Sequence, residues 1–201
     1  MNVVFDAMGT LFDLAPLRDR LGAAATEAWF ERILHSAATL TILDDFVPFK
    51  ELARTTLATT CAKLALDADQ DDVLAQLQHL PPADGAREAL ERAEHAFVLT
   101  NGGREGGEAL VENAGLDGLV ERVFGVDEVR AYKPDPRPYR LVLDALGDAT
   151  LVAAHAWDVA GAARAGMRAV WVDRDERVWP FPSDVAPHAT VRSLAEAITP
   201  R

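Results

Sequence analysis

The sequence contains a single cysteine, Cys61, and no long apolar stretch. One cysteine excludes an intrachain disulfide and any zinc site built from several thiolates. No apolar run approaches the roughly 20 residues that a membrane-spanning helix needs. The opening residues, MNVVFDAM, lack the basic segment followed by a long apolar stretch that marks a signal peptide. We therefore expect a soluble cytoplasmic protein that does not insert into a membrane.

Positively charged residues are also scarce. The 20 Lys and Arg residues stand against 32 Asp and Glu residues, which gives a formal net charge of −12. Such an acidic surface repels nucleic acids and anionic membranes, so neither is expected as a partner. The length of 201 residues and the 49% share of hydrophobic residues are enough for one sizeable core with a small appended domain.

Several short apolar runs have the character of buried parallel strands, because most are rich in Val or aromatic residues. Segments with helical spacing of small and apolar residues lie between them, over 84–94, 106–114 and 160–165. Strands that alternate with helices predict an α/β domain with a parallel sheet and right-handed crossovers. The predicted strands span residues 3–5, 96–99, 122–124, 150–153 and 168–172.

The stretch from about 14 to 80 contains no convincing strand. Apolar residues recur there at helical spacing over 26–43, 46–66 and 71–77, and Pro81-Pro82 then breaks the chain. This pattern predicts an α/β core formed by residues 1–13 and 81–201, and a helical insertion formed by residues 14–80. Ligands bind beyond the carboxyl ends of parallel strands, and the insertion leaves from that edge. We therefore expect it to cover the ligand site as a lid.

Polar residues follow two of the predicted strands. Asp6 ends the first strand, and Gly9-Thr10 then permits a sharp turn and places a hydroxyl group beside the acid. Thr100-Asn101 ends the second strand and is followed by two glycines, so these side chains can donate hydrogen bonds to an anion. Each feature alone is also explained by an ordinary turn at the end of a strand.

Two further candidates come later in the chain. Prolines surround Lys133 and fix the backbone, which reduces the entropy cost of directing its side chain inward. Asp158 follows a strand and precedes a helix, where it could instead serve as a helix cap. His155 has no histidine or cysteine neighbour at a spacing that binds metal. The carboxyl ends of the strands would bring Lys133 and Asp158 to the same edge as Asp6.

Taken in sequence order, these stretches resemble the four signatures of the haloacid dehalogenase superfamily of hydrolases. The matching segments are FDAMGTLFD, VLTNGG, YKPDPRPY and AWDVAGAARAGM. The resemblance covers nearly the whole chain, including the helical insertion after the first signature. It implies a Rossmann-like parallel-sheet core with an inserted helical cap domain at 14–80. It also implies that Asp6 is a nucleophile that forms a covalent aspartyl intermediate.

Two positions distinguish the branches of this superfamily. Most members are magnesium-dependent phosphatases, in which a second acid two residues after the nucleophile acts as general acid and base. Met8 occupies that position here. The magnesium-binding acid of the fourth phosphatase signature corresponds to Ala154. Because Mg²⁺ prefers carboxylate oxygens, the sequence predicts no cofactor, and Mg²⁺ only under the phosphatase alternative.

The (S)-2-haloacid dehalogenases are the more similar branch, since they have a non-acidic residue at the position of Met8 and read Ala-Trp-Asp in the fourth signature. The resemblance implies that Asp6 attacks the halogen-bearing carbon of a small anionic 2-haloacid, and that Asp158 activates the water that hydrolyses the ester. Lys133 would hold Asp6 ionised and oriented. A departing halide needs no proton, so a second acid is dispensable. A carboxylate at position 8 would also repel the anionic substrate, by about 4 kcal/mol at about 4 Å and an effective dielectric constant of about 20.

The same resemblance assigns roles to further residues. Three polar side chains would bind the substrate carboxylate or steady Asp6, namely Thr10, Thr100 and Asn101. An apolar wall would favour displacement because a desolvated carboxylate is a better nucleophile. Members of this branch are often dimers, so a homodimer is compatible with the sequence. The substrate-binding residues would be Met8, Phe49, Trp157, His155 and Tyr139.

The sequence departs from the dehalogenase pattern in the cap and in the fourth signature. Dehalogenases carry a cap arginine that receives the halide, and counting back from Phe49 places Phe30 at that position. Arg18, Arg20 or Arg32 could substitute for it. His155 stands where asparagine is usual. Two alternatives to a dehalogenase therefore stay open: a magnesium-dependent phosphatase, and a catalytically impaired binding protein on the same scaffold.

Overall fold

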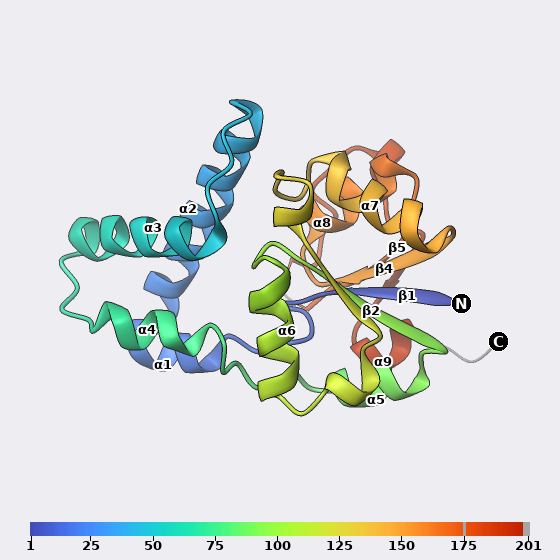
Figure 1. Ribbon diagram of the computed structural model, residues 1–201, viewed down its shortest axis with the longest axis horizontal. Coiled ribbons are helices and arrows are strands. Elements are labelled where there is room, and N and C mark those ends of the chain that lie inside the picture. The colour runs from blue at the N-terminus through green and yellow to red at the C-terminus, as the bar shows by residue number, and fades with distance from the viewer. Residues whose placement is uncertain (175, 199–201) are drawn as a thin grey trace.

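The computed structural model describes residues 1–174 and 176–198. Its centre is a six-stranded sheet in the order β3-β2-β1-β4-β5-β6, and every pairing between neighbouring strands is parallel (Figure 1). The predicted α/β class is therefore confirmed. The strands are β1 (Asn2–Asp6), β2 (His95–Thr100), β3 (Arg122–Gly125), β4 (Ala149–Ala153), β5 (Arg168–Val172) and β6 (Ala189–Val191).

The strands predicted from apolar runs are the five that are most buried. Val3, Val4 and Phe5 of β1 are buried, as a strand with helices on both faces requires. The sixth strand, β6, was not predicted. It has three residues and a largely exposed side-chain pattern, so it carries no apolar signal of its own.

Helices cover both faces of the sheet. Side chains of α5 (Ala86–Arg92), α6 (Arg104–Asn113) and α9 (Leu194–Ala197) pack in one apolar cluster with Val3 and Phe5. Side chains of α7 (Pro136–Leu146) and α8 (Ala156–Ala165) pack in a second cluster with Val4 on the opposite face. Three short 3₁₀ turns complete the core: η1 (Asp117–Leu119), η2 (Val126–Glu128) and η3 (Ser183–Val185).

Local sequence explains why α7 begins where it does. The carboxylate of Asp135 accepts a hydrogen bond from the backbone N–H of Arg137, and Pro136 occupies the first helical position. The prolines that were expected to fix the backbone around Lys133 therefore also start a helix, which the sequence analysis did not predict.

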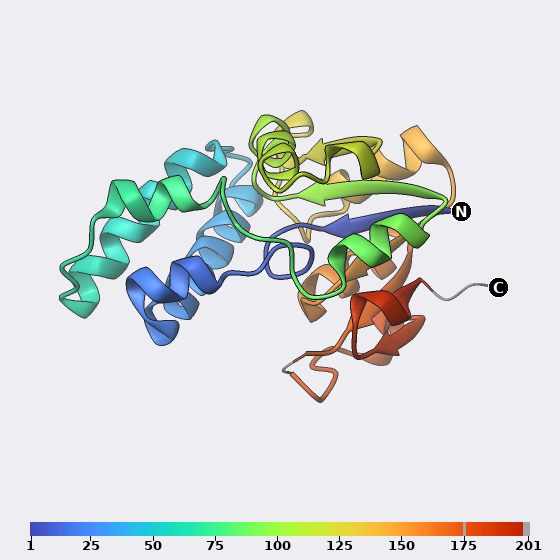
Figure 2. The same cartoon turned by 90° about the horizontal axis from the view of Figure 1, so that it is seen from below.

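Four helices follow β1 and form the segment that we interpret as a cap: α1 (Ala15–Leu21), α2 (Ala23–Ile42), α3 (Phe49–Leu64) and α4 (Gln70–Gln76). They lie to one side of the sheet (Figures 1 and 2). The side chain of Trp29 is fully buried between α2 and α3, and its indole N–H donates to the hydroxyl of Thr56 at 3.1 Å. Within the described residues, no helix has the length and apolar character needed to cross a membrane.

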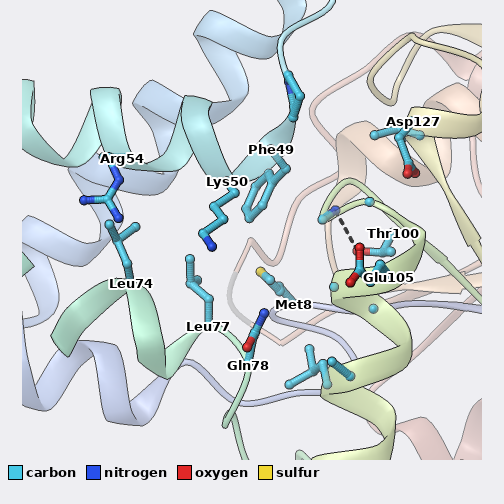
Figure 3. Close-up of a pocket in the computed structure, with 18 of the residues that line it drawn as sticks. Met8, Phe49, Lys50, Arg54, Leu74, Leu77, Gln78, Thr100, Glu105 and Asp127 are labelled. Carbon is cyan, nitrogen blue, oxygen red and sulfur yellow. Dashed lines mark hydrogen bonds between the residues drawn. The ribbon is translucent and has the colours of Figure 1, made fainter. Parts of the chain in front are cut away.

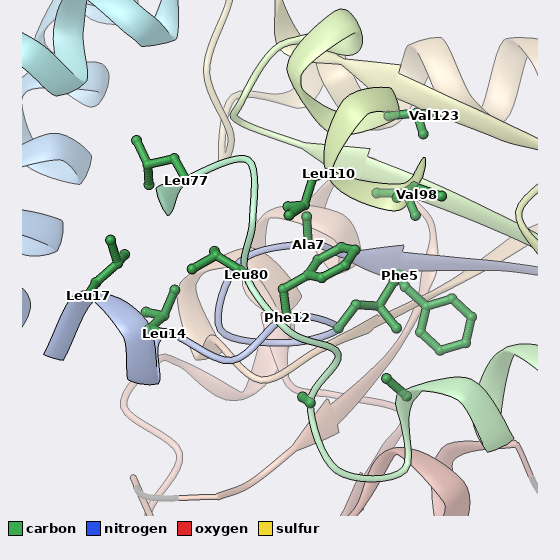
Figure 4. Close-up of a cluster of buried hydrophobic side chains, with 14 of the residues drawn as sticks. Phe5, Ala7, Phe12, Leu14, Leu17, Leu77, Leu80, Val98, Leu110 and Val123 are labelled. Atoms are coloured by element: carbon green, nitrogen blue, oxygen red, sulfur yellow. The ribbon is translucent and has the colours of Figure 1, made fainter. Parts of the chain in front are cut away.

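Two neighbouring segments join the cap to the core (Figure 2). The N–H of Asp13 donates to the carbonyl of Pro81 at 2.9 Å, and the N–H of Ala83 donates to that of Leu11 at 2.7 Å. Apolar side chains of both segments, including Phe12 and Leu80, continue the core towards the cap (Figure 4). The cap is thus held against the edge of the sheet by paired backbone and shared apolar contacts.

We expect Gly161→Ala to lower the free energy of unfolding by about 1–3 kcal/mol, because α7 and α8 approach too closely for a methyl group. A Cβ at this position would lie 2.6 Å from the hydroxyl oxygen of Tyr139 and 2.7 Å from Cβ of Pro134. Chemical denaturation measures the change. Gly118→Ala is the control, since a Cβ there meets nothing within 4 Å. Equal losses in the two variants would contradict this view of the helix contact.

Candidate active site

The candidate site lies at the carboxyl ends of the strands, where the strand order reverses between β1 and β4. Asp6 is the last residue of β1, and Asp158 lies in the first turn of α8, which follows β4. Lys133 comes from the segment between η2 and α7. Three segments that are distant in sequence therefore converge at the place where ligands bind in open α/β sheets.

Lys133 connects the two acids. Its ammonium group donates to Asp6 Oδ1 at 2.8 Å, to Asp158 Oδ2 at 2.7 Å and to the carbonyl oxygen of Leu99 at 3.0 Å. The lysine side chain is 0% exposed, and those of Asp6 and Asp158 are 7% and 0% exposed. All three ammonium protons are therefore used within the protein interior.

The pKa values of these groups follow from burial and from their mutual attraction. Burial alone would raise the pKa of Asp6, but the positive charge of Lys133 and a contact with His155 outweigh it, so this pKa lies well below its usual range. Burial opposes the charge of Lys133, yet Asp158 and Asp6 raise its pKa. Asp6 is therefore a carboxylate at neutral pH and faces a permanent ammonium group.

Asp158 responds in the opposite direction. Burial raises the pKa of its carboxyl group, the attraction of Lys133 offsets only part of this effect, and the negative charge of Asp6 adds to it. Of the two acids, Asp158 is the one better suited to accept a proton.

A second set of contacts orients Asp6. The hydroxyl of Thr10 donates to Asp6 Oδ2 at 2.7 Å and accepts the N–H of Ala154 at 2.9 Å. His155 Nδ1 lies 3.1 Å from the same carboxylate oxygen, to which it donates because an ionised carboxylate only accepts. Gly9 makes room for the imidazole, since a Cβ there would lie 2.7 Å from His155 Cε1. Gly9 also has a φ of +79°, a conformation that favours glycine.

Tyr139, which was predicted to bind substrate, has a different position. It lies in α7, is 0% exposed, and its hydroxyl donates to Asp158 Oδ1 at 2.6 Å. Its position on α7 directs its ring into the contact with α8 instead of towards the cavity between cap and core. We therefore revise its role from substrate binding to orienting Asp158.

Thr100, Asn101 and Trp157 surround the same centre. Asn101 Oδ1 accepts the backbone N–H of Lys133 at 2.9 Å, so it fixes the segment that carries the lysine and does not touch Asp6. The hydroxyl of Thr100 accepts the N–H of Gly102 at 2.9 Å. Trp157 stacks on His155 with ring centroids 5.5 Å apart, and the Lys133 ammonium lies 5.7 Å from its ring centroid.

A cavity of about 710 Å³ lies between the cap and the core, and it borders this centre through Met8 and Thr100, whereas Asp6, Lys133 and Asp158 do not line it. Its wall includes Met8 from the segment after Asp6, Thr100 from the end of β2, and Phe49 from the start of α3 (Figure 3). The two predicted substrate-binding residues Met8 and Phe49 thus line the cavity. His155 and Trp157 are not part of its wall. His155 instead contacts the Asp6 carboxylate, and Trp157 stacks on His155.

None of the cap arginines proposed as halide ligands lines this cavity. Arg18 and Arg20 each form an ion pair with an aspartate outside it, and Arg32 donates to a threonine hydroxyl of α3. Phe30 packs edge-to-face against the neighbouring Trp29. The position that the sequence count identified is therefore occupied by an aromatic side chain with a packing role.

Two basic residues that the sequence analysis missed do line the cavity, both from α3. Arg54 is paired with Asp71 at 2.9 Å. Lys50 has no hydrogen-bond or ion-pair partner among residues 1–174 and 176–198, and its amino group points into the cavity (Figure 3). Lys50 directly follows Phe49, so a search for any cation near the predicted pocket wall would have found it.

The residues present do not fit a magnesium site. Met8 and Ala154 supply no oxygen ligands at the two positions where phosphatases have acids, and the ammonium group of Lys133 bridges the carboxylates of Asp6 and Asp158. In the part of the chain that the structure describes, no group of three or more His, Cys, Asp or Glu side chains is arranged to hold a metal ion.

Comparison with known proteins decides the family. A family model described as haloacid dehalogenase-like hydrolase matches residues 1–166. The chain belongs to this family of hydrolases. The hydrolase is 30% identical to haloacetate dehalogenase H-2 of Moraxella sp. (strain B), over 86% of this chain and 85% of that protein. It is also 30% identical to the (S)-2-haloacid dehalogenase of Pseudomonas sp. (strain YL), over 89% and 84% of the two chains.

Solved structures give the same relationship. The L-2-haloacid dehalogenase of Xanthobacter autotrophicus superimposes on the hydrolase with a TM-score of 0.87 and 27% identity, covering 98% of this chain and 96% of that one. The same enzyme with chloropropionic acid covalently bound gives a TM-score of 0.87 and 26% identity, with the same coverage. The predicted superfamily and the hydrolase class are therefore confirmed.

We expect Lys133→Met to lower the free energy of unfolding of the hydrolase by about 3–5 kcal/mol at pH 7, because it leaves two buried carboxylates without a counter-charge. The loss should shrink at pH 4. In the wild type, the lowered pKa of Asp6 stabilises the folded protein at pH values above the usual carboxyl pKa, and this stabilisation decreases as the pH falls. In the variant, the two carboxyl groups bind protons in the folded state at low pH, which removes their repulsion. Urea denaturation at both pH values measures this, with exposed Lys63→Met as control. A loss independent of pH would contradict it.

Proposed function

We propose that the hydrolase is a metal-independent 2-haloacid dehalogenase, which converts a 2-haloacid and water into a 2-hydroxy acid and halide. The observation that carries this proposal is the ionised carboxylate of Asp6, held by Lys133, with Met8 at the position where phosphatases have a second acid. Such a site can displace a leaving group that needs no proton. It is poorly suited to a phosphate ester, whose leaving alcohol requires one.

The first step is a substitution at carbon. One oxygen of Asp6 attacks C2 of the haloacid, the carbon–halogen bond breaks, and the halide leaves with the bonding electrons. Lys133 holds Oδ1, while Thr10 and His155 hold Oδ2, so the carboxylate is presented in a fixed orientation. The product of this step is an ester of Asp6.

The second step is hydrolysis of that ester. Water attacks the Asp6 carbonyl carbon and passes one proton to Asp158. The ester C–O bond then breaks, and the departing alkoxide takes up the second proton of that water, which releases the 2-hydroxy acid and regenerates the Asp6 carboxylate. Asp158 finally loses its proton to solvent. The raised pKa of Asp158 favours this proton transfer, and Tyr139 holds its other oxygen. The Lys133 ammonium faces the negative charge that develops on the ester oxygen.

The related proteins support the same chemistry. The curated relatives from Moraxella and Pseudomonas are a haloacetate and a 2-haloacid dehalogenase, and the Xanthobacter enzyme has been seen with chloropropionic acid covalently bound. All matches cover most of both chains. The substrate we propose is accordingly a small 2-haloacid anion.

The decisive test is halide release from 2-chloropropionate. We expect turnover by the wild type that survives EDTA and is lost in Asp6→Asn, with Asp19→Asn on the surface of α1 as control. Chloride measurement gives the rate, and intact-protein mass spectrometry detects the ester. The phosphatase alternative predicts instead that Mg²⁺ stimulates hydrolysis of p-nitrophenyl phosphate. That result, with no halide from short haloacids, would refute the proposal.

We propose further that Lys50 supplies the positive charge that stabilises the departing halide in place of a cap arginine. It is the cation that lines the cavity without a partner among the described residues, whereas Arg54 is neutralised by Asp71. A cation facing developing negative charge lowers the barrier to its separation.

Lys50→Met should therefore reduce kcat/KM for 2-chloropropionate by roughly tenfold or more, mainly through kcat. Lys50→Arg should recover most of the rate, because it keeps the charge. Lys63→Met, at the far end of the same helix, serves as the matched control and should behave as wild type. A Lys50→Met enzyme with unchanged kcat would show that the halide is stabilised elsewhere.

A further inference from the structure

The cavity is much larger than a short haloacid requires. 2-Chloropropionate has six non-hydrogen atoms, and on the scale of about 30 Å³ per water molecule it needs less than about 200 Å³. The cavity beside Met8 and Thr100 measures about 710 Å³. Most of its volume therefore lies beyond the atoms that would react.

The additional space is bounded mainly by apolar side chains. Phe46 comes from the segment before α3 and Phe49 from the first residue of that helix. The other apolar side chains are Leu74 of α4, Leu77 directly after it, and Leu110 of α6. In Figure 3, Phe49, Leu74 and Leu77 border the cavity on the cap side. An apolar wall of this kind suits a hydrocarbon chain, because its burial removes apolar surface from water.

Gly106 of α6 lines the cavity and contributes no side chain to its wall. A Cβ at Gly106 would meet nothing within 4 Å, and Gly106 does not adopt the positive φ that favours glycine. Neither packing nor backbone geometry requires glycine there, although glycine weakens a helix by about 1 kcal/mol relative to alanine. The neighbouring Gly107 differs, since its Cβ would lie 2.8 Å from Val123 and 2.9 Å from Thr100.

We infer that the cavity is a subsite for an alkyl chain, and that the substrate is a 2-haloalkanoic acid of medium chain length. The reacting C2 lies at the end beside Met8 and Thr100, and the tail runs between Phe49 on the cap and Gly106 on α6. This inference rests on the proposed function and names its substrate class. Charged groups also reach the cavity, namely Lys50, the Arg54–Asp71 pair, Glu105 and Asp127.

The test compares racemic 2-bromo acids of three to ten carbons. In the wild type we expect kcat/KM to rise about three- to fourfold for each added CH₂ group over the first few carbons, as burial of a methylene predicts. Gly106→Leu adds a large side chain to the α6 part of the wall, at a position where a Cβ meets nothing within 4 Å. It should reduce the ratio of kcat/KM for 2-bromooctanoate over 2-bromopropionate to about one. Gly118→Leu, on an exposed turn where a Cβ meets nothing, should keep the wild-type ratio.

The outcomes separate this inference from the proposed function. A wild type that turns over 2-bromopropionate but gains nothing from a longer chain overturns the inference alone, as does an equal ratio in wild type and Gly106→Leu. A wild type that releases no halide from any acid overturns the proposed function. Calorimetric titration with decanoate and propionate then tests the cavity directly: preference for decanoate that Gly106→Leu removes supports the tail subsite, and equal binding overturns it. Circular dichroism verifies the fold of each variant.

Discussion

The structure of the site depends on one ammonium group that lies between two buried carboxylates. Lys133 reaches Asp6 and Asp158 at 2.8 and 2.7 Å, and none of the three side chains is substantially exposed. Charges so far from water are tolerated only when each finds an opposite charge and enough hydrogen-bond partners. Thr10 and His155 add contacts to Asp6, and Tyr139 adds one to Asp158. The proposed nucleophile Asp6, the cation Lys133 and the proposed proton acceptor Asp158 therefore form a single unit.

The surrounding fold brings these three side chains together. The strand order places β1 beside β4, so Asp6 and the start of α8 meet at the point where the chain reverses direction in the sheet. The close contact of α7 and α8 at Gly161 aligns Tyr139 with Asp158. The cap is attached next to Asp6 by two paired segments, and its side chains form part of the cavity wall. The core thus holds the ammonium–carboxylate unit, while cap and core together line the cavity.

Much of the fold could be predicted from the sequence, because a buried parallel strand needs apolar residues on both faces and that need is visible locally. The five runs predicted as strands correspond to β1 through β5. The two misses have different causes. β6 has three residues and exposed side chains, and it is formed by pairing with β5 rather than by a local pattern. The start of α7 does carry a local signal, Asp135 followed by Pro136, but it lies within the proline-rich stretch after Lys133, where prolines suggested a fixed loop.

The sequence by itself determined the order of the signatures, the family and the convergence of Asp6, Lys133 and Asp158, since the ends of parallel strands share one edge of a sheet. Only the tertiary structure decided which side chains face the reacting centre from the cap. It turned Tyr139 inward towards Asp158 and placed Lys50 and Arg54 of α3 in the cavity wall. These features depend on how helices from distant parts of the chain pack together. The residue spacing along one helix does not specify which helix it packs against.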